Sequence, residues 1–205
     1  MVEEPSRHLT GVRRLSQAIA EGDGISVIVH AVDLAGVRAA EEQGAEALAL
    51  TRRLDGVREA TSLPLLWCAP GPPRTAADAG ADAWCLVVEH ADDDHGVLEA
   101  IQAEAAGLGL ECVVDVRDED ELASALERLD PEIFLLSGRE ANDDEDPLDH
   151  VLGLLPDVPA GKLAIAEVPV GTREEVVALE RAGIDGVIVR AGDVTELVGD
   201  ATPQV

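Results

Sequence analysis

Residues 82–116 read DAWCLVVEHADDDHGVLEAIQAEAAGLGLECVVDV, and the pattern of this stretch decides the predicted fold. It contains two short, nearly continuous apolar runs, at 82–88 and 110–116. Runs of this kind are typical of parallel strands that are covered on both faces. A helical pattern lies between them and ends at Gly107 and Gly109, a common signal for a helix C-terminus. The stretch therefore predicts two buried strands joined by a helix.

The same alternation continues along the chain. The runs predicted to be strands are residues 25–32, 45–50, 63–67, 82–88, 110–116, 132–137, 163–168 and 185–189. The helical segments carry start and stop signals, such as the capping-box pair Thr172 and Glu175 ahead of Gly183. Eight strands with intervening helices favour a (βα)8 TIM barrel. An open doubly wound sheet is the alternative, but HAVDLAG (30–36) follows the first strand where a nucleotide-binding sheet needs GxGxxG.

Length and composition agree with one domain. The 205 residues are 46% hydrophobic and 1% aromatic, so the core must consist mainly of Ala, Val, Leu and Ile. We predict a single barrel with short loops over residues 1–205, including an N-terminal helical extension (1–24) and a C-terminal tail (198–205). No apolar run reaches the ~20 residues of a membrane helix and the N-terminus lacks a signal-peptide pattern, which indicates a cytoplasmic protein.

The chain is strongly acidic. Its 42 Asp and Glu oppose 15 Lys and Arg, which gives a formal net charge of −27, and Lys162 is the only lysine. Such a field repels nucleic acids and anionic membranes, so neither is predicted as a partner. It suggests adaptation to high salt, with an ordinary acidic protein from a host of biased codon usage as the alternative. No cofactor is predicted, and the composition is compatible with a homodimer.

The predicted strand ends carry many polar side chains. In a barrel, active sites lie at the C-terminal ends of the strands. The residues there are His30, Asp33, Thr51, Arg52, Trp67, Cys68, Glu89, His90, Asp115, Arg117, Ser137, Arg139, Glu167 and Arg190. Carboxylates, imidazoles, a thiol and guanidiniums on one rim suffice for acid–base chemistry or for holding an anion. Gly171 and Gly192, in the turns after the last two strands, indicate a partial phosphate site to which Arg190 adds charge.

Each of these side chains has a second interpretation. His30 is either a general base or a hydrogen-bonded rim histidine. Cys68 is a nucleophile, a small apolar group or, with His30 and His90, a zinc ligand, although the spacing gives no metal signal. Glu167 is harder to explain structurally, because a carboxylate at the end of an apolar strand is costly without a partner or a function. The acidic tract 139–150 is interpreted as a solvated loop, and no metal site is predicted.

Four segments resemble the indole-3-glycerol phosphate synthase family of tryptophan biosynthesis. Residues 80–127 resemble its fourth strand through fifth helix, with GADA (80–83), LGL (108–110) and VDVRDEDEL (114–122). The other three are SLPLLWCAP (62–70), IFLLSGRE (133–140) and IAEVPVGTREEVVALERAGIDGVIV (165–189). The resemblance implies a (βα)8 barrel. In active members it implies a carboxy-lyase reaction, the ring closure of a carboxyphenylamino-deoxyribulose phosphate with loss of carbon dioxide and water.

The family's functional residues carry over only in part. The resemblance aligns the first-strand glutamate and a nearby lysine with His30 and Val32, the general-acid lysine with Cys68, and the fifth-strand glutamate with Asp115. It aligns the sixth-strand asparagine and arginine with Ser137 and Arg139, the seventh-strand glutamate with Glu167, and the phosphate-binding Gly-Ser with Arg190 and Ala191. A thiol cannot act as a cation that both donates a proton and holds a carboxylate, so loss of the family reaction is predicted.

Two functional hypotheses follow. The first is a barrel of the synthase type with lost or altered catalysis, which binds a small anionic or phosphorylated molecule. The second is an active lyase or isomerase in which His30, Asp115 and Glu167 transfer protons while Arg139 and Arg190 hold an anion.

Overall fold

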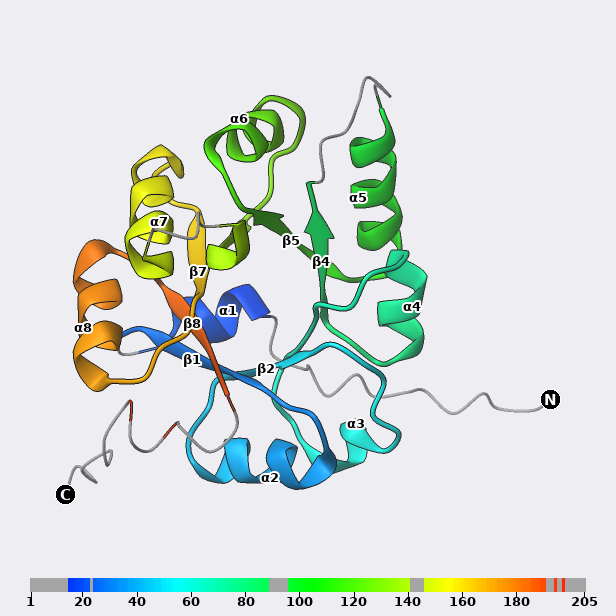
Figure 1. Cartoon of the computed structure of the whole chain (residues 1–205). Helices are drawn as coiled ribbons and strands as arrows, with labels where there is room; N and C mark the ends of the chain where they lie inside the picture. Colours follow the sequence, from blue (N-terminus) through cyan, green and yellow to red (C-terminus); the bar gives the residue numbers. More distant parts are fainter. Residues whose placement is uncertain are drawn as a thin grey trace.

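The eight predicted strands form one closed parallel barrel (Figure 1). The computed structural model describes residues 15–22, 24–88, 96–140 and 146–190, together with Val194 and Leu197. The strands are β1 (Ser26–His30), β2 (Ala47–Leu50), β3 (Leu65–Trp67), β4 (Ala83–Val87), β5 (Glu111–Val116), β6 (Ile133–Ser137), β7 (Leu163–Glu167) and β8 (Gly186–Arg190). Each strand pairs with its neighbour in sequence, and β8 pairs with β1. The prediction of a (βα)8 TIM barrel is confirmed.

Helices surround the barrel. They are α2 (Leu34–Glu42), α3 (Val57–Ala60), α4 (Pro73–Asp78), α5 (Val97–Gly107), α6 (Glu119–Arg128), α7 (Pro147–Leu154) and α8 (Arg173–Ala182), with short 3-10 turns η1 (Gly138–Glu140) and η2 (Leu155–Asp157). The capping box predicted for Thr172 and Glu175 is present at the start of α8. The single turn α3 was not predicted, because four residues are too few to show a helical period.

Alternation along each strand divides the buried residues into two cores. Successive side chains of a strand point to opposite faces, so one set enters the barrel and the other faces the helices. The inner core includes Ile28, Leu66, Val113, Leu135 and Ile165. Trp67 belongs to the outer core and is only 3% exposed, so the expectation that it lies on the rim is wrong. The next residue, Cys68, packs against the inner core.

The N-terminal end of the barrel is closed by α1 (Leu15–Ala20), which lies across the ring of strands in Figure 1. Leu15 and Ile19 enter the inner core. Glu111, at the start of β5, accepts a hydrogen bond of 2.6 Å from the backbone N–H of Leu15 and another from the hydroxyl of Ser16. Of the predicted N-terminal extension, residues 1–14 lie outside the described part of the chain. This plug leaves the opposite, C-terminal end of the barrel for a binding site.

Three acidic side chains hold neighbouring strands in register. Each precedes an even-numbered strand, follows a helix-ending glycine of positive φ by two residues, and accepts a hydrogen bond from a backbone N–H of the preceding strand. The pairs are Glu46 with Val27, Asp82 with Leu65 and Asp185 with Ala164, each at 2.8 Å, after Gly44, Gly80 and Gly183. The repetition explains the recurring Gly-x-acidic pattern ahead of these strands, which the sequence analysis did not interpret.

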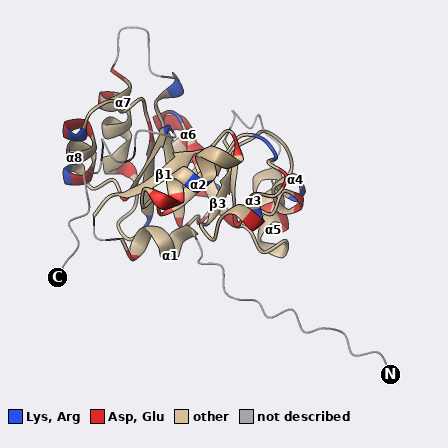
Figure 2. Ribbon diagram, turned by 90° about the horizontal axis from the view of Figure 1, so that it is seen from below, with Lys and Arg blue, Asp and Glu red and all other residues tan. Residues whose placement is uncertain are grey.

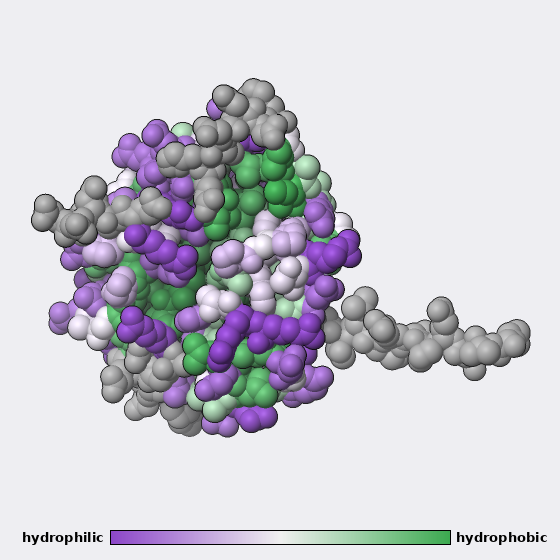
Figure 3. All heavy atoms as spheres, turned by 45° about the vertical axis from the view of Figure 1, so that its right-hand side comes forward, coloured by the Kyte–Doolittle hydropathy of each residue, from purple (hydrophilic) through white to green (hydrophobic). Residues whose placement is uncertain are grey.

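The outer surface is dominated by acidic and other polar side chains. Figure 2 shows Asp and Glu on the outer helices, with fewer Lys and Arg among them, and Figure 3 shows hydrophilic side chains over much of the face it presents. Lys162 precedes β7 at the N-terminal end of the barrel and donates to Asp130 at 2.5 Å. None of the described helices is long and apolar enough to cross a membrane.

Replacing Asp82 tests the role of these acidic side chains. Asp82 also accepts a hydrogen bond from Arg58, so Asp82→Ala leaves the Leu65 N–H without its acceptor and removes the carboxylate that pairs with the guanidinium, which keeps its hydrogen bonds to the carbonyls of Leu63 and Gly80. We expect the free energy of unfolding in urea to fall by about 2–3 kcal/mol. The control is Asp55→Ala, whose exposed pair with Arg53 is worth no more than about 0.5 kcal/mol. Equal losses in both variants would contradict the proposed role.

Candidate active site

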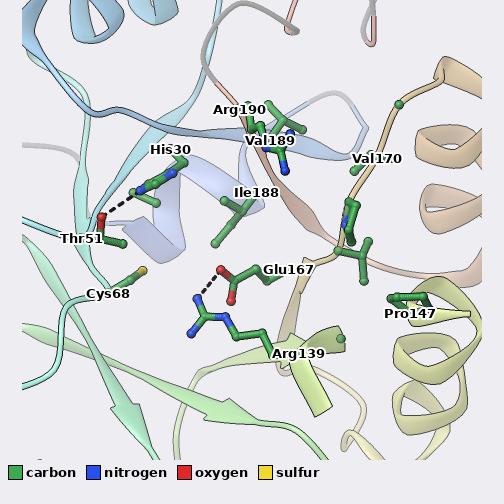
Figure 4. A pocket seen from close by; sticks show the side chains of 15 residues that line it. His30, Thr51, Cys68, Arg139, Pro147, Glu167, Val170, Ile188, Val189 and Arg190 are labelled. Atoms are coloured by element: carbon green, nitrogen blue, oxygen red, sulfur yellow. Dashed lines mark hydrogen bonds and ion pairs between the residues drawn. The ribbon is translucent and has the colours of Figure 1, made fainter. Parts of the chain in front are cut away.

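A cavity of about 550 Å³ opens at the C-terminal end of the barrel. Its polar lining comes from five strand ends and from η1: His30, Thr51, Cys68, Arg139, Glu167 and Arg190 (Figure 4). The register explains this meeting, because His30 pairs with Arg190 across β1 and β8, and Ser137 pairs with Glu167 across β6 and β7. Six of the side chains predicted at strand ends thus line one cavity, although they are widely separated in the chain.

Glu167 and Arg139 form an ion pair in the cavity. Ser137 lies beside them: its hydroxyl is 3.5 Å from Glu167 Oε2 and accepts a hydrogen bond of 3.4 Å from the backbone N–H of Arg139. Gly138 makes this turn possible, because a Cβ there would lie 2.9 Å from Pro147 Cβ. Burial opposes the charge of Arg139, but the hydrogen bond and charge of Glu167 together hold the guanidinium pKa above its ordinary value. Glu167, a carboxylate at the end of an apolar strand, is therefore stabilised by a cationic partner.

Asp115 lies beneath this pair and not on the cavity wall. It pairs with Val87 and Leu135, two residues below the level of Glu167 in the register, and is 2% exposed. Its Oδ1 has no hydrogen-bond partner among the described residues. Burial first, and then the charge of Glu167, raise its pKa from 3.8 to about 6, against the opposing effect of Arg139 and Arg117. Asp115 is thus a carboxyl group that exchanges its proton close to neutral pH.

His30 and Thr51 form a hydrogen-bonded pair of 3.0 Å on the wall of the cavity opposite Glu167 (Figure 4). This contact agrees with the interpretation of His30 as a hydrogen-bonded rim histidine. His30 also lines the cavity, so its role as a general base stays a prediction. Cys68 lies on the same side, with its sulfur toward the centre of the cavity (Figure 4).

The turn after β7 was predicted to bind phosphate. Its backbone N–H groups are hydrogen-bonded instead to a side chain of α8, the helix that follows the turn. The backbone N–H groups of Gly171 and Thr172 donate to Glu175 Oε2 at 2.8 and 2.9 Å. These hydrogen bonds lower the pKa of Glu175. A phosphate at this turn must displace that carboxylate. Gly192, the other predicted glycine, lies outside the described residues.

Arg190 is the cationic side chain of the cavity that remains available to a ligand. It is exposed, lines the cavity and forms no ion pair with another residue of the described ranges. The apolar part of the lining was missed from sequence; it includes Val168, Pro169 and Val170. The signal was present as the VPV run directly after Glu167.

The described residues contain no group of three or more His, Cys, Asp and Glu placed to hold a metal ion. His90, the third member of the zinc alternative, lies outside those residues, as do Glu89 and positions 141–145 of the acidic tract. The zinc alternative, which the sequence did not favour, is therefore not tested.

The raised pKa of Asp115 predicts a pH-dependent effect on stability. A carboxyl group whose pKa is about 6 in the folded chain and near 3.9 when unfolded stabilises the fold below about pH 4, and this contribution is lost as the pH rises through about 6. Asp115→Asn keeps a neutral side chain, so we expect it to be more stable than the wild type at about pH 8, by at most about 3 kcal/mol, and no more stable at about pH 4.

Urea unfolding at the two pH values measures this difference. Asp157→Asn, an exposed position on η2, is the matched control and is expected to show no pH-dependent gain. An Asp115→Asn variant without a gain at the higher pH would show that Asp115 has an ordinary pKa.

The comparisons with solved structures agree with the observed architecture. The chain is similar to a mutant tryptophan synthase alpha-subunit from Pyrococcus furiosus, with a TM-score of 0.64, 16% identity and coverage of 86% of this chain and 98% of that one. It is also similar to the N-acetylmannosamine-6-phosphate 2-epimerase of Clostridium perfringens, with a TM-score of 0.65, 13% identity and coverage of 96% and 94%. At these identities the likeness concerns the fold alone.

The sequence comparisons concern the family. The chain is 36% identical over 110 residues to the indole-3-glycerol phosphate synthase of Variovorax paradoxus, covering 54% of this chain and 40% of that protein. It is 33% identical over 140 residues to the enzyme of Acidithiobacillus ferrooxidans, covering 66% and 52%. The chain thus matches about half the length of these relatives or less. The family model for indole-3-glycerol phosphate synthase matches residues 74–194, more than half of the chain. This chain belongs to the indole-3-glycerol phosphate synthase family.

Proposed function

We propose that the cavity binds a small phosphorylated or otherwise anionic molecule and that the chain does not catalyse the ring closure of active family members. The observation that carries the proposal is Cys68 in the cavity, at the position that the family resemblance assigns to the general-acid lysine. The only lysine of the chain, Lys162, lies at the other end of the barrel and donates a hydrogen bond to Asp130. No lysine is therefore available to take over the role.

The chemistry of a thiol supports the loss of the reaction. A neutral thiol is a weak hydrogen-bond donor and carries no positive charge with which to hold a substrate carboxylate. General acid–base catalysis typically contributes about 10²–10⁴-fold to a rate. In this chain the first-strand glutamate is also replaced, by His30, and its imidazole is hydrogen-bonded to Thr51. Two of the family's functional positions in the cavity thus carry different chemistry.

The charges in the cavity support anion binding. Arg139 is already paired with Glu167, whereas Arg190 faces the cavity without such a partner in the described part of the chain. Guanidinium groups suit phosphate and carboxylate because their N–H groups donate in a planar fork. The volume of about 550 Å³ lies in the usual range of roughly 300–1,000 Å³ for small-molecule sites.

Ligand titrations followed by thermal unfolding test this proposal. Indole-3-glycerol phosphate and its carboxyphenylamino precursor are titrated separately, at low and at high potassium chloride, and bound ligand raises the unfolding temperature. We expect Arg190→Ala to weaken binding about 10- to 100-fold, because a hydrogen bond to a charged group is worth about 1.5–3 kcal/mol. Arg181→Ala, at an exposed position on α8, is the control and is expected to bind like the wild type.

The same samples test the absence of the ring closure. We expect no indole-3-glycerol phosphate from the precursor at any enzyme concentration that gives a binding signal. Formation of product that requires Glu167 would contradict the loss of catalysis. An unfolding temperature that does not respond to millimolar ligand would contradict binding of the family's ligands at this site.

A second candidate function is proton transfer by a lyase or isomerase. The observation that favours it is the pair of carboxylates at Asp115 and Glu167, of which Asp115 has its pKa raised to about 6. A carboxyl group tuned toward neutral pH suits general acid–base catalysis. Incubation with phosphorylated ketoses in D₂O is expected to incorporate deuterium if this candidate is correct, and Glu167→Gln is expected to abolish the incorporation. Absence of exchange would favour the binding proposal.

A further inference from the structure

Two cysteines of neighbouring strands meet at the floor of the cavity. The register of β3 and β4 pairs Leu66 with Ala83 and Trp67 with Trp84, so the next step along both strands places Cys68 beside Cys85. Both side chains point into the barrel, where Cys85 belongs to the inner core and Cys68 packs against it. Neighbouring strands lie about 4.8 Å apart, within the separation of roughly 4.4–6.8 Å between Cα atoms that a disulfide spans.

The two thiols differ in exposure. Cys68 lines the cavity, whereas Cys85 is 6% exposed. A hydrogen bond to Cys68, together with burial, raises the pKa of Cys85 well above its ordinary value. The third thiol, Cys112 on β5, packs against the outer core, on the other side of the strands, and burial raises its pKa to about 12. One thiol is thus open to small reagents and has a second thiol directly beside it.

We propose that Cys68 and Cys85 form a modification site, a dithiol that a two-electron oxidant such as hydrogen peroxide converts into an intramolecular disulfide. All three cysteines are free in this structure. The proposal does not depend on which molecule the cavity binds.

The order of the two steps follows from the exposure. The Cys68 thiolate attacks one peroxide oxygen, the O–O bond breaks, and the departing hydroxide takes up the proton of the thiol, which leaves a sulfenic acid and one water. The sulfur of Cys85 then attacks the sulfur of Cys68, the S–O bond breaks, and the proton of Cys85 leaves with the hydroxide as a second water. Two thiols are oxidised and one peroxide is reduced. A dithiol reductant reverses the change.

Cys68 is the thiol that a reagent in the cavity meets first, because it lines the cavity whereas Cys85 is buried. Formation of the disulfide turns the Cys68 sulfur toward Cys85 and away from the cavity. It also links the end of β3 covalently to β4 beneath the cavity.

Peptide mapping without reduction tests the proposal on the wild-type chain. Reduced protein is treated with hydrogen peroxide, free thiols are alkylated, and the chain is cut with trypsin and a glutamate-specific protease. This digestion separates the three cysteines into peptides 60–74, 75–89 and 112–117. We expect peptides 60–74 and 75–89 to be joined, with a mass lower than their sum by two hydrogens. We expect Cys112 to be alkylated and the joined species to disappear after treatment with dithiothreitol.

Two variants give matched controls. Cys112→Ser is expected to form the same joined peptide as the wild type, whereas Cys85→Ala is expected to form none and to carry sulfenic or sulfinic acid at Cys68. The proposal is overturned if wild-type Cys68 is oxidised to sulfinic acid while Cys85 is still alkylated, or if the linkage runs through Cys112. The wild-type map decides between these outcomes even if a variant does not fold.

Discussion

Closure of the eight-stranded barrel is the constraint on which the remaining structure depends. In a closed parallel barrel each strand sends every second side chain inward, and the register determines which of them share a level. At the C-terminal end this leaves about one inward position for each strand. The polar lining of the cavity comes from the ends of five of these strands, β1, β2, β3, β7 and β8, together with Arg139 of η1. The opposite end is closed by α1, whose Leu15 and Ile19 complete the inner core while Glu111 anchors its first turn. The barrel therefore has a single open end.

The electrostatics of that end are unusual for so acidic a chain. Glu167 and Arg139 neutralise each other, and the buried Asp115 beneath them has a pKa near 6 because of burial and the adjacent carboxylate. Arg190 adds positive charge on the rim. The cavity thus contains a local cation within a protein of net charge −27. The local arrangement of charges, and not the net charge, governs what the cavity can hold.

Two of the proposals concern Cys68, which the family resemblance aligns with the general-acid lysine. The proposed loss of the ring closure rests on the missing cation and proton donor at this position, and the proposed dithiol rests on the thiol beside Cys85 of the neighbouring strand. A fold that is retained while its chemistry changes is common among barrels, because function resides in a few side chains at the strand ends. In this chain those side chains keep the carboxylate and guanidinium of Glu167 and Arg139.

Local sequence patterns were enough to predict the eight strands, the helix caps such as the Thr172 capping box and the strand ends that line the cavity, because these signals arise within a few residues. Three further features are visible only in the folded chain: Trp67 faces the outer core, Glu175 occupies the amides of Gly171 and Thr172, and Asp115 lies buried beneath Glu167. The contact between Cys68 and Cys85 is likewise visible only in the folded chain. The physical reason is that burial and contact across strands depend on register between distant segments, which no local pattern specifies.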